Sequence, residues 1–411
     1  MSDLNRSKTF AVEEVKGWPS TTDVKGILGS IIRLWYMYDL DLPALIRGKI
    51  LHTQTDPLTD REVIEIARKL CESGDNYSGI LWLEALLQRK QRDSDGNVSE
   101  EIISSRLAQY YNQYDMPWKS VEVLEKFQTN GSKVTRANYK YFKIRAAEIK
   151  TARKPFSQIS FTNADEKYKE LCNRNNQTVS HMSTLRCFLT KTSIPFIRGR
   201  EEVLNQRPRI SMFHDVISKS DIEKIKITSA ERFKDSTVVL TAGSTTNVHM
   251  RVSQTHWMSE NDFTRRLTWK IGILTGLNTT FRKRVSDSEP FQVLNYGSGG
   301  MYNPHVDPLQ GTQSPDYLVG SGDRLATWMF YLSSVTAGGA TVFPRLRVRI
   351  PVVEGAAAFW FNLVDDGRVD QRTVHAGCPV LLGSKWVANK WIHSNAQMFV
   401  RPCKARHTPY L

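Results

Sequence analysis

The 411-residue chain has only five cysteines, and none of them shows CxxC spacing. Structural zinc sites usually take closely spaced ligand pairs, so this class of site is not expected. The N-terminal run MSDLNRSKTF also lacks a continuous apolar stretch. We therefore see no signal peptide or membrane span in the sequence, and we expect no membrane partner.

The sequence also lacks any long block of charge of one sign, although its formal net charge is +14 at pH 7. An anionic partner would suit that charge, but no RNA- or DNA-binding fingerprint is present. Short basic clusters such as RKQR and FRKR are typical of a solvated surface. We therefore predict no nucleic-acid partner, and the net charge stays unexplained.

A His-X-Asp pair is the most specific motif present. His305 and Asp307 stand two residues apart in YGSGGMYNPHVDP, so on a strand both side chains point to one face. His375 follows 70 residues later (375 − 305) in TVHAGCPVLLG. Two imidazoles and one carboxylate leave adjacent positions open on a metal, as in non-haem Fe(II) oxygenases. The alternative is that each is an ordinary core or surface residue.

Lys385 follows His375 by ten residues (385 − 375), an even interval that suits two neighbouring strands joined by a tight turn. An inward lysine among Val, Leu, Trp and Ala is costly unless an anion neutralises it. A dicarboxylate co-substrate would do so. The alternative is a solvated lysine in the GSK turn, since lysine is rarely buried.

Short runs rich in β-branched and aromatic residues recur through the last third of the chain. They are PFQVLNY, TWMFYLSS, ATVFP, VRIPV, AAAFWFNL, TVHAGCPVLL and KWVANKWIH. Many short strands in succession favour a sandwich or barrel, and a double-sheet jelly roll of the cupin kind encloses a ligand. A helix over residues 268–276 is predicted to support this roll.

The first third has a helical pattern instead. Apolar residues recur at three- and four-residue intervals, as in Val63, Ile66 and Leu70, and Thr59 with Glu62 is a candidate capping box. Paired helices with a Gly-Asp turn resemble tetratricopeptide units, though only about two and a half of them. We predict an α+β protein with four parts: an extension (1–21), an all-α tetratricopeptide-like domain (22–150), a connector (151–208) and a jelly-roll domain (209–411).

Four long runs resemble one known family. NYGSGGMYNPHVD, DRLATWMFYLSSVTAGGATVFP, AFWFNL and RTVHAGCPVLLGSKWVANKWIH are similar to the catalytic domain of collagen-type prolyl 4-hydroxylase alpha subunits, which are Fe(II)/2-oxoglutarate dioxygenases. The resemblance implies hydroxylation of proline C4 in collagen-like X-Pro-Gly peptides, with release of succinate and CO2. The cofactors and co-substrates implied are Fe(II), 2-oxoglutarate, O2 and ascorbate.

The resemblance also implies a role for each matching residue. The iron ligands would be His305, Asp307 and His375. The residues around 2-oxoglutarate would be Lys385, Tyr296, Thr341 and Trp391. The further catalytic residues would be Tyr302, Arg324 and His393. The substrate contacts in this domain would be Arg251, Ser253 and Glu289. Each of the last six could instead be an ordinary salt-bridge or core residue.

In these alpha subunits the helical domain binds proline-rich peptide, in polyproline II form, on a row of tyrosines. The residues that could form such a row here are Tyr110, Tyr111, Tyr114, Tyr139 and Tyr141. Helix packing is an equal alternative, because aromatic residues dominate cores as well as interfaces. The chain departs from the family at Asn76, where a tyrosine is expected, so the peptide specificity stays open.

The family further implies two disulfides, Cys172–Cys187 and Cys378–Cys403, with Cys71 left free. It implies the lumen of the endoplasmic reticulum and an alpha2 beta2 tetramer with protein disulfide isomerase. Asn-X-Ser/Thr sequons fit a glycosylated secretory protein. They include Asn5, Asn76, Asn97, Asn176 and Asn278.

Two alternatives stand beside an active prolyl 4-hydroxylase. One is a non-catalytic paralogue or subunit that only binds proline-rich peptide through its helical groove; the complete ligand set argues against it. The other is a 2-oxoglutarate oxygenase that acts on nucleic acid, which would explain the charge. The lack of a base-binding module argues against this second alternative.

Overall fold

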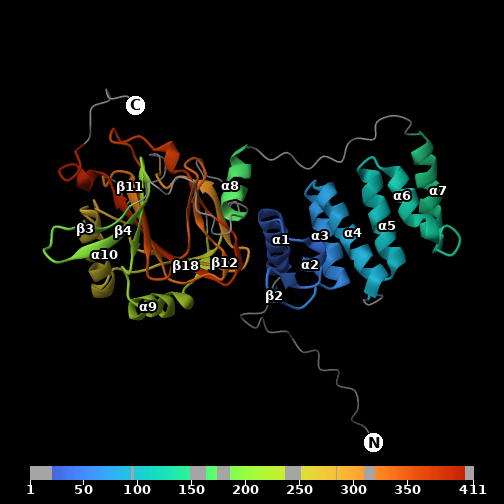
Figure 1. Cartoon of the computed structure of the whole chain (residues 1–411), viewed down its shortest axis with the longest axis horizontal. Helices are drawn as coiled ribbons and strands as arrows, with labels where there is room; N and C mark the ends of the chain where they lie inside the picture. The colour runs from blue at the N-terminus through green and yellow to red at the C-terminus, as the bar shows by residue number, and fades with distance from the viewer. Residues whose placement is uncertain are drawn as a thin grey trace, which may run out of the picture. The chain divides into compact units, whose positions relative to one another are not determined.

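The computed structural model describes residues 21–93, 97–148, 163–173, 186–236, 251–283, 285–309 and 320–402. The chain divides into two compact units (Figure 1). Unit 1 comprises Met1–Ile32 and Leu42–Gln158, and unit 2 comprises Arg33–Asp41 and Ile159–Leu411. No helix in the described ranges is long and apolar enough to cross a lipid bilayer.

Unit 1 is a row of helices in which α3 packs on α4, α4 on α5, α5 on α6 and α6 on α7. The helices are α1 (Thr21–Tyr38, whose last residues belong to unit 2), α2 (Leu42–Ile46), α3 (Asp60–Glu72), α4 (Asn76–Asp93), α5 (Glu100–Gln113), α6 (Pro117–Leu124), the short η1 (Glu125–Phe127) and α7 (Lys133–Glu148). A small hairpin of β1 (Lys49–Ile50) and β2 (Thr53–Gln54) lies between α2 and α3.

The start of α3 shows why the helical prediction succeeds in unit 1. The Thr59 hydroxyl accepts from the Glu62 backbone N–H, while the Glu62 carboxylate accepts from the Thr59 backbone N–H, so the predicted capping box is confirmed. The apolar stripe of Val63, Ile66 and Leu70 is buried. Capping and burial therefore act on the same helix, as the periodicity predicts.

Unit 2 is built on two antiparallel sheets. The larger sheet has, in order, β3 (Arg186–Lys191), β4 (Arg198–Gln206), β5 (Arg209–His214), β15 (Ala357–Phe361), β11 (Arg324–Tyr331), β18 (Lys385–His393), β9 (Gln292–Tyr296), β8 (Gln254–Trp257) and β6 (Lys234–Asp235). The smaller sheet has β14 (Val348–Ile350), β13 (Thr341–Phe343), β16 (His375–Gly377), β10 (Met301–His305) and β7 (Arg251–Val252). A separate ribbon pairs β12 (Ala337–Gly338) with β17 (Val380–Leu382).

The helices of unit 2 are α8 (Asn163–Asn173), α9 (Lys219–Ala230) and α10 (Asp262–Thr275), with the short η4 (Gln371–Thr373) and η5 (Asn395–Gln397). Helices α9 and α10 contribute to an apolar core on the outer face of the larger sheet (Figure 1). Helix α8 packs on β13 and β14 of the smaller sheet. The helix predicted over 268–276 is confirmed, although it begins six residues earlier, at Asp262.

Strand β11 shows how one strand serves two cores. Trp328 and Phe330 face the core shared with α9 and α10, whereas Met329 and Tyr331 face the core between the two sheets. Because both faces are covered, the strand reads as a continuous apolar run. The mixed helix-and-sheet class predicted from the sequence is confirmed, and the sheets of unit 2 enclose the space in which the candidate site lies.

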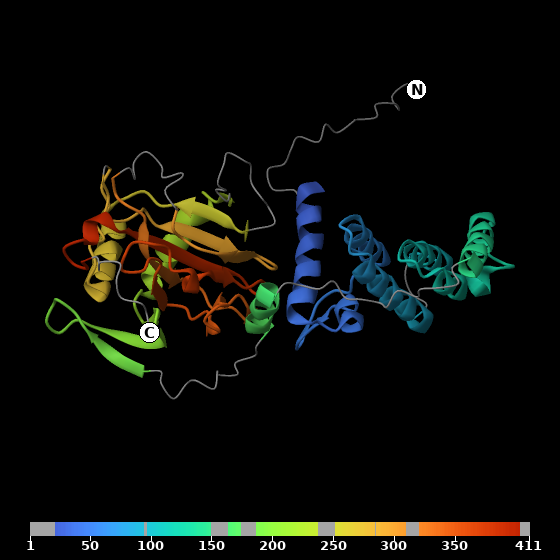
Figure 2. The ribbon, with the colours of Figure 1, turned by 90° about the horizontal axis from the view of Figure 1, so that it is seen from above.

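The predicted connector over 151–208 is wrong in its second half. Strands β3 and β4 form the edge of the larger sheet, and β4 pairs with β5 along most of its length. Figure 2 shows this hairpin, in light green, at the margin of unit 2. The side chains of β3 are mostly exposed, so the apolar alternation that identifies a strand is missing from its sequence.

The disulfide pairing also differs from the prediction. Cys172 is bonded to Cys378, which leaves Cys187 as an exposed thiol, and Cys403 lies outside the described residues. The reason is that α8 packs on the smaller sheet and places Cys172 beside the turn after β16, whereas Cys187 lies on the edge strand β3 of the larger sheet. Connectivity of this kind cannot be deduced from spacing.

Replacing Trp328 by alanine should destabilise unit 2 by about 3–5 kcal/mol, because it empties a fully buried site. The Trp328 ring lies 5.0 Å from the Phe213 ring and 5.6 Å from the Phe330 ring. Chemical denaturation measures the loss. Trp269→Ala, at a site on α10 that is 58% exposed, is the control and should stay within about 0.5 kcal/mol of the parent. Equal losses at the two sites would contradict the assignment of this core.

Candidate active site

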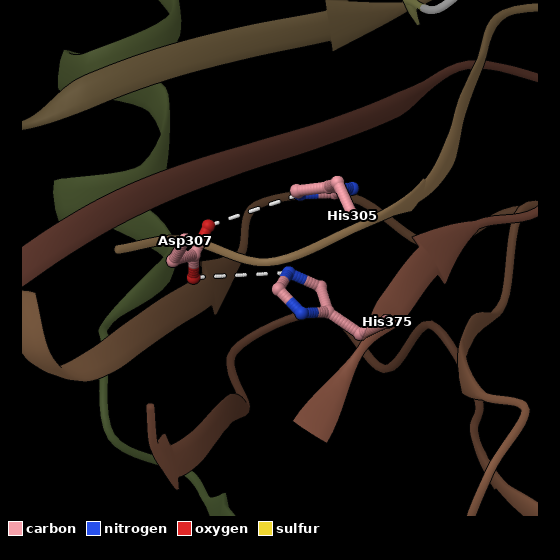
Figure 3. Close-up of side chains that lie close together, drawn as sticks. All are labelled: His305, Asp307 and His375. Atoms are coloured by element: carbon pink, nitrogen blue, oxygen red, sulfur yellow. Dashed lines mark ion pairs between the residues drawn. The ribbon is translucent and has the colours of Figure 1, made fainter. Parts of the chain in front are cut away.

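The three residues of the His-X-Asp…His pattern come together in unit 2 (Figure 3). His305 ends β10 and His375 begins β16, and the two residues lie opposite each other in the antiparallel pair. His305 Nε2 is 3.8 Å from Asp307 Oδ1, and His375 Nε2 is 3.7 Å from Asp307 Oδ2. One donor atom from each of the three side chains lies within 4.8 Å of the others, so all three can face one ion.

Backbone carbonyls orient both imidazoles. His305 Nδ1 lies 2.8 Å from Asn303 O, and His375 Nδ1 lies 3.1 Å from Thr373 O. A carbonyl oxygen only accepts, so each Nδ1 carries the proton and each Nε2 keeps its lone pair for a metal. Burial, together with the nearby His375, lowers the pKa of His305 to about 3. Its imidazole is therefore neutral at physiological pH, the form that a metal needs.

Asp307 supplies the negative charge of the group. Burial on its own would raise the pKa of this carboxyl, but His375, His305 and the Thr327 hydroxyl outweigh that effect and lower it. The donor set is thus two imidazoles and one carboxylate on one side of the ion. This set fits ferrous iron, with the opposite positions left for a co-substrate and O2.

Aromatic rings enclose the two imidazoles. The Tyr302 ring stacks on His305 with centroids 3.5 Å apart, and the Trp360 ring meets His375 edge-on at 4.7 Å. The Phe343 ring lies 5.6 Å from His375. Trp360 and Phe343 were not predicted as part of the site. Their strands were predicted, and Phe343 has the same parity on β13 as the predicted Thr341, a signal that could have identified it.

Lys385 lies in the same unit, on β18 opposite Tyr296 of β9. Its ammonium donates to the Thr341 hydroxyl, with Nζ and Oγ1 3.2 Å apart, and the Tyr331 hydroxyl donates to the same oxygen at 3.0 Å. Burial lowers the pKa of Lys385 to about 7, and no carboxylate among the described residues pairs with it. A buried ammonium without a counter-ion suits the carboxylate of a ligand. Tyr331 is an unpredicted member of this group.

Arg324, Glu289 and His393 form a closed buried network. The Arg324 guanidinium donates to both Glu289 oxygens, at 2.5 and 2.9 Å, and His393 Nε2 lies 3.1 Å from Glu289 Oε1. Although burial opposes it, Arg324 and His393 together lower the pKa of Glu289 to about 2. Glu289 is 1% exposed and His393 is 0% exposed. Both side chains are thus engaged within the network, and the contact of Glu289 with substrate and the catalytic role of His393 stay predictions.

Arg324 connects this network to His305, Asp307 and His375, which we call the metal group. Its guanidinium lies 3.7 Å from the centroid of the Trp391 ring, and Nη1 donates to the Asp307 carbonyl oxygen at 3.1 Å. Trp391 in turn lies 5.9 Å from Trp257, whose side chain is 41% exposed. Trp257 was not predicted, and it marks the point at which this aromatic group reaches the surface.

The predicted substrate pair Arg251 and Ser253 lies on the other side of Tyr302. Arg251 Nε donates to the Ser253 hydroxyl at 3.2 Å, and the guanidinium is 4.8 Å from the centroid of the Tyr302 ring. Burial raises the pKa of Tyr302 to about 12, so its hydroxyl stays protonated and can donate. The structure thus brings Arg251, Ser253 and Tyr302 together next to His305.

The tyrosines of unit 1 separate into two groups. Tyr111 is 5% exposed and donates to the Glu84 carboxylate, and Tyr139 is buried in the core of α5, α6 and α7. Tyr111 therefore packs inside unit 1, and its contact with peptide stays a prediction. Tyr110 and Tyr114 are half-buried, and Tyr141 on α7 is exposed. These three keep a surface that a ligand can reach.

Several contacts from outside the sheets fix the turns next to the metal strands. The Arg33 guanidinium donates to Gly299 O at 2.6 Å and the Tyr168 hydroxyl donates to Gly377 O at 3.0 Å. Tyr38 donates to Pro379 O, and the Cys172–Cys378 bond joins the same turn. We call Arg33, Tyr38, Tyr168 and Cys172 the outer brace. Its members are far from the motifs in sequence, and no local pattern identifies them.

Residues 291–393 match the family model of the 2OG-Fe(II) oxygenase superfamily. Over 416 residues the chain is 32% identical to "Prolyl 4-hydroxylase subunit alpha-1" of Bos taurus, which covers 94% of this chain and 76% of the relative. The alpha-1 subunit of Gallus gallus is 33% identical over 414 residues, with 94% and 79% covered. The alpha-3 subunit of Mus musculus is 32% identical over 419 residues, with 94% and 76% covered.

The chain belongs to the prolyl 4-hydroxylase alpha-subunit family. It is accordingly an oxygenase that uses Fe(II), 2-oxoglutarate and O2, as predicted. Among solved structures, the viral collagen prolyl hydroxylase of Paramecium Bursaria Chlorella virus-1 in its 2OG complex matches 45% of this chain and 95% of its own, with 22% identity and a TM-score of 0.35. A Pseudomonas putida prolyl-4-hydroxylase matches 45% and 92%, with 15% identity and a TM-score of 0.32.

The affinity of this family member for 2-oxoglutarate should fall as the pH rises above about 7. Below the pKa of Lys385, the ammonium can pair with a carboxylate; above it, the neutral amine cannot. The loss should approach tenfold per pH unit. Titration of the Mn(II)-loaded protein with 2-oxoglutarate between about pH 6 and about pH 9 measures it. Lys385→Ala, the control, should bind weakly with no such slope, and a flat parent profile would contradict the assignment.

Proposed function

We propose that the chain hydroxylates proline at C4 in collagen-like X-Pro-Gly peptides, with O2 and 2-oxoglutarate, releasing succinate and CO2. Membership of the alpha-subunit family supports this reaction. The observation that carries it is the grouping of His305, Asp307 and His375 in unit 2, which also holds the buried Lys385, a lysine that no described carboxylate neutralises. The alternative of a non-catalytic peptide-binding paralogue is not favoured, because the ligand set is complete.

Each group of residues has a separate task in this reaction. Bound iron would supply the oxidative chemistry that couples decarboxylation of 2-oxoglutarate to oxidation of the proline C4–H bond. His305, Asp307 and His375 would hold it. Lys385 and the Thr341 hydroxyl would receive the far carboxylate of 2-oxoglutarate, and Tyr296 would close that end of the pocket. The ligand then lies in a water-poor space, where a charge pair is stronger than in solvent.

Residues on the other side of the metal group would receive the peptide. Tyr302 offers a protonated hydroxyl beside His305, and Arg251 offers a guanidinium that stacks on the Tyr302 ring. The exposed Trp257, beside Trp391, would provide an aromatic surface that suits a proline ring. Arg324 would act indirectly, by holding Trp391 and the Asp307 backbone.

The chain with Fe(II), 2-oxoglutarate and a (Pro-Pro-Gly) repeat peptide should add the mass of one oxygen atom per hydroxylated proline, with one succinate formed per event. His305→Ala should abolish turnover, because it removes one of the metal ligands. Its affinity for the peptide should change little if unit 1 binds peptide. Mass spectrometry and peptide titration measure the two properties, and loss of both together would contradict the division of tasks between the units.

For unit 1 we propose a tetratricopeptide-like domain that binds proline-rich peptide. The sequential packing of α3 to α7 and the partly exposed tyrosines Tyr110, Tyr114 and Tyr141 support this role. A further tyrosine, Tyr77, has its ring centroid 6.5 Å from that of Tyr114 and extends the aromatic surface beside Asn76. A preformed polyproline II peptide loses little entropy when it docks on such rings.

Tyr114→Ala should weaken the binding of a (Pro-Pro-Gly) repeat peptide roughly fivefold, since an accessible aromatic contact in an interface contributes about 1 kcal/mol. Tyr111→Phe is the matched control. It removes only a hydroxyl that faces Glu84, so peptide affinity should not change. Isothermal titration of both variants measures the difference. A larger loss of peptide affinity in Tyr111→Phe than in Tyr114→Ala would mean that the peptide binds elsewhere.

We also propose that the protein works in the lumen of the endoplasmic reticulum, in an alpha2 beta2 tetramer with protein disulfide isomerase, with ascorbate as reductant and with N-linked glycans. The Cys172–Cys378 bond supports an oxidising compartment, where disulfides persist. Asn97 is an exposed sequon asparagine. The family supplies the rest of this proposal. Secretory localisation and co-purification with the isomerase test it.

A further inference from the structure

Three polar side chains, Asn362, Thr327 and Asp307, form a hydrogen-bonded row beside the metal group, which we call the file. Asn362, Thr327 and Asp307 are each buried, and the first two are 1% exposed. Asn362 Nδ2 is 2.9 Å from Thr327 Oγ1, and Thr327 Oγ1 is 2.5 Å from Asp307 Oδ2. Both Thr327 and Asn362 lie in runs that resemble the family, but the resemblance assigns neither residue a role toward iron, co-substrate or peptide.

The chemistry of the three groups sets the direction of both hydrogen bonds. The Asp307 carboxylate is an acceptor only, so the single hydroxyl proton of Thr327 must be donated to it. The Thr327 oxygen is then left to accept, and only the NH2 end of the Asn362 amide can donate to it. A reversed amide would put two acceptors against each other. The file therefore has one consistent arrangement.

This arrangement distinguishes the two oxygens of Asp307. Oδ2 receives the Thr327 hydroxyl and lies 3.7 Å from His375 Nε2, whereas Oδ1 receives no hydrogen bond from the described residues and lies 3.8 Å from His305 Nε2. The carbonyl oxygen of the same residue accepts from Arg324. Asp307 is thus held at its backbone and at one carboxylate oxygen. Rotation of the carboxylate about its last bond would break the Thr327 contact.

The sheet explains how the file is built. Thr327 lies on β11 with the same parity as Met329 and Tyr331, which face the space between the sheets. Asn362 directly follows β15, its backbone N–H donates to Leu325 O, and its carbonyl accepts from the Asp370 backbone N–H. Valine at 327 would have nearly the same shape as threonine and would suit the apolar neighbours. Burying these polar groups costs desolvation free energy that valine at 327 would avoid.

We propose that Thr327 and Asn362 are positioning residues for the metal carboxylate. Thr327 fixes which oxygen of Asp307 faces the ion, and Asn362 fixes the direction of the Thr327 hydroxyl. The inference rests on the proposed iron site, but not on proline as the substrate. Partners of this kind orient metal ligands, and their loss usually weakens metal binding by about tenfold to a hundredfold.

The test is Co(II) binding to the metal-free full-length chain, followed by visible absorption, with thermal unfolding of the metal-free protein recorded in parallel. Thr327→Val should weaken Co(II) binding about tenfold or more. Thr327→Ser keeps the donor and should restore affinity close to that of the parent. Asn362→Leu should give an intermediate loss, because the hydroxyl survives but is free to turn. All of these variants should unfold within a few degrees of the parent.

Thr268→Val is the matched control, since Thr268 is also buried but lies on α10, on the outer face of the larger sheet. It should leave Co(II) affinity unchanged. Parent-like affinity in Thr327→Val, or an equal loss in Thr327→Ser, would overturn the inference. If Thr327→Val does not fold, the order parent, Thr327→Ser, Asn362→Leu decides the question. Absence of proline hydroxylation with this order preserved would refute the proposed substrate and leave the positioning role standing.

Discussion

The register between β10 and β16 is the constraint on which the site depends, because it places His305 opposite His375. A slip of one residue would turn one imidazole to the other face of the sheet. The same strand pair contains a bulge: Tyr302 pairs with Gly377, so three steps on β10 match two on β16. On a regular strand Tyr302 and His305 would face opposite sides. The extra residue lets the tyrosine ring stack on the imidazole beside the metal group.

Two kinds of buried charge lie near that register. Arg324 and Glu289 form a closed ion pair, so their charges neutralise each other. Through Arg324 the pair also holds the Trp391 ring and the Asp307 backbone in place. Among the described residues, the Lys385 ammonium has only hydroxyl and aromatic partners, so its charge is available to a ligand that enters from solvent. Arg324, which is paired with Glu289, therefore supports the site, whereas Lys385, which no described carboxylate neutralises, marks the ligand pocket. Residue type alone would not separate these two roles.

The chemistry of the site could be predicted from the sequence because its signals are local. The two-residue spacing of His305 and Asp307, together with the parity of the strands, predicts that the metal ligands lie on one face. The capping box at Thr59 predicts the start of a helix in the same local way. Features set by long-range packing were missed. The Tyr111 hydroxyl donates to Glu84, Cys172 meets Cys378 across 206 residues, and β3 has no apolar alternation. None of these contacts leaves a pattern in its own stretch of chain.

The outer brace bears on how this protein can be divided. Arg33–Asp41 belongs to unit 2 although unit 1 follows it along the chain, and Met37 packs in the same apolar cluster as Leu171 and Val342. A fragment that starts at 159 would lose Arg33, Met37 and Tyr38, and would expose an apolar patch behind the strand that carries His375. The oxygenase unit is therefore discontinuous in sequence. Gene shuffling or truncation that treats the two units as separable modules would remove a piece of the one it intends to keep.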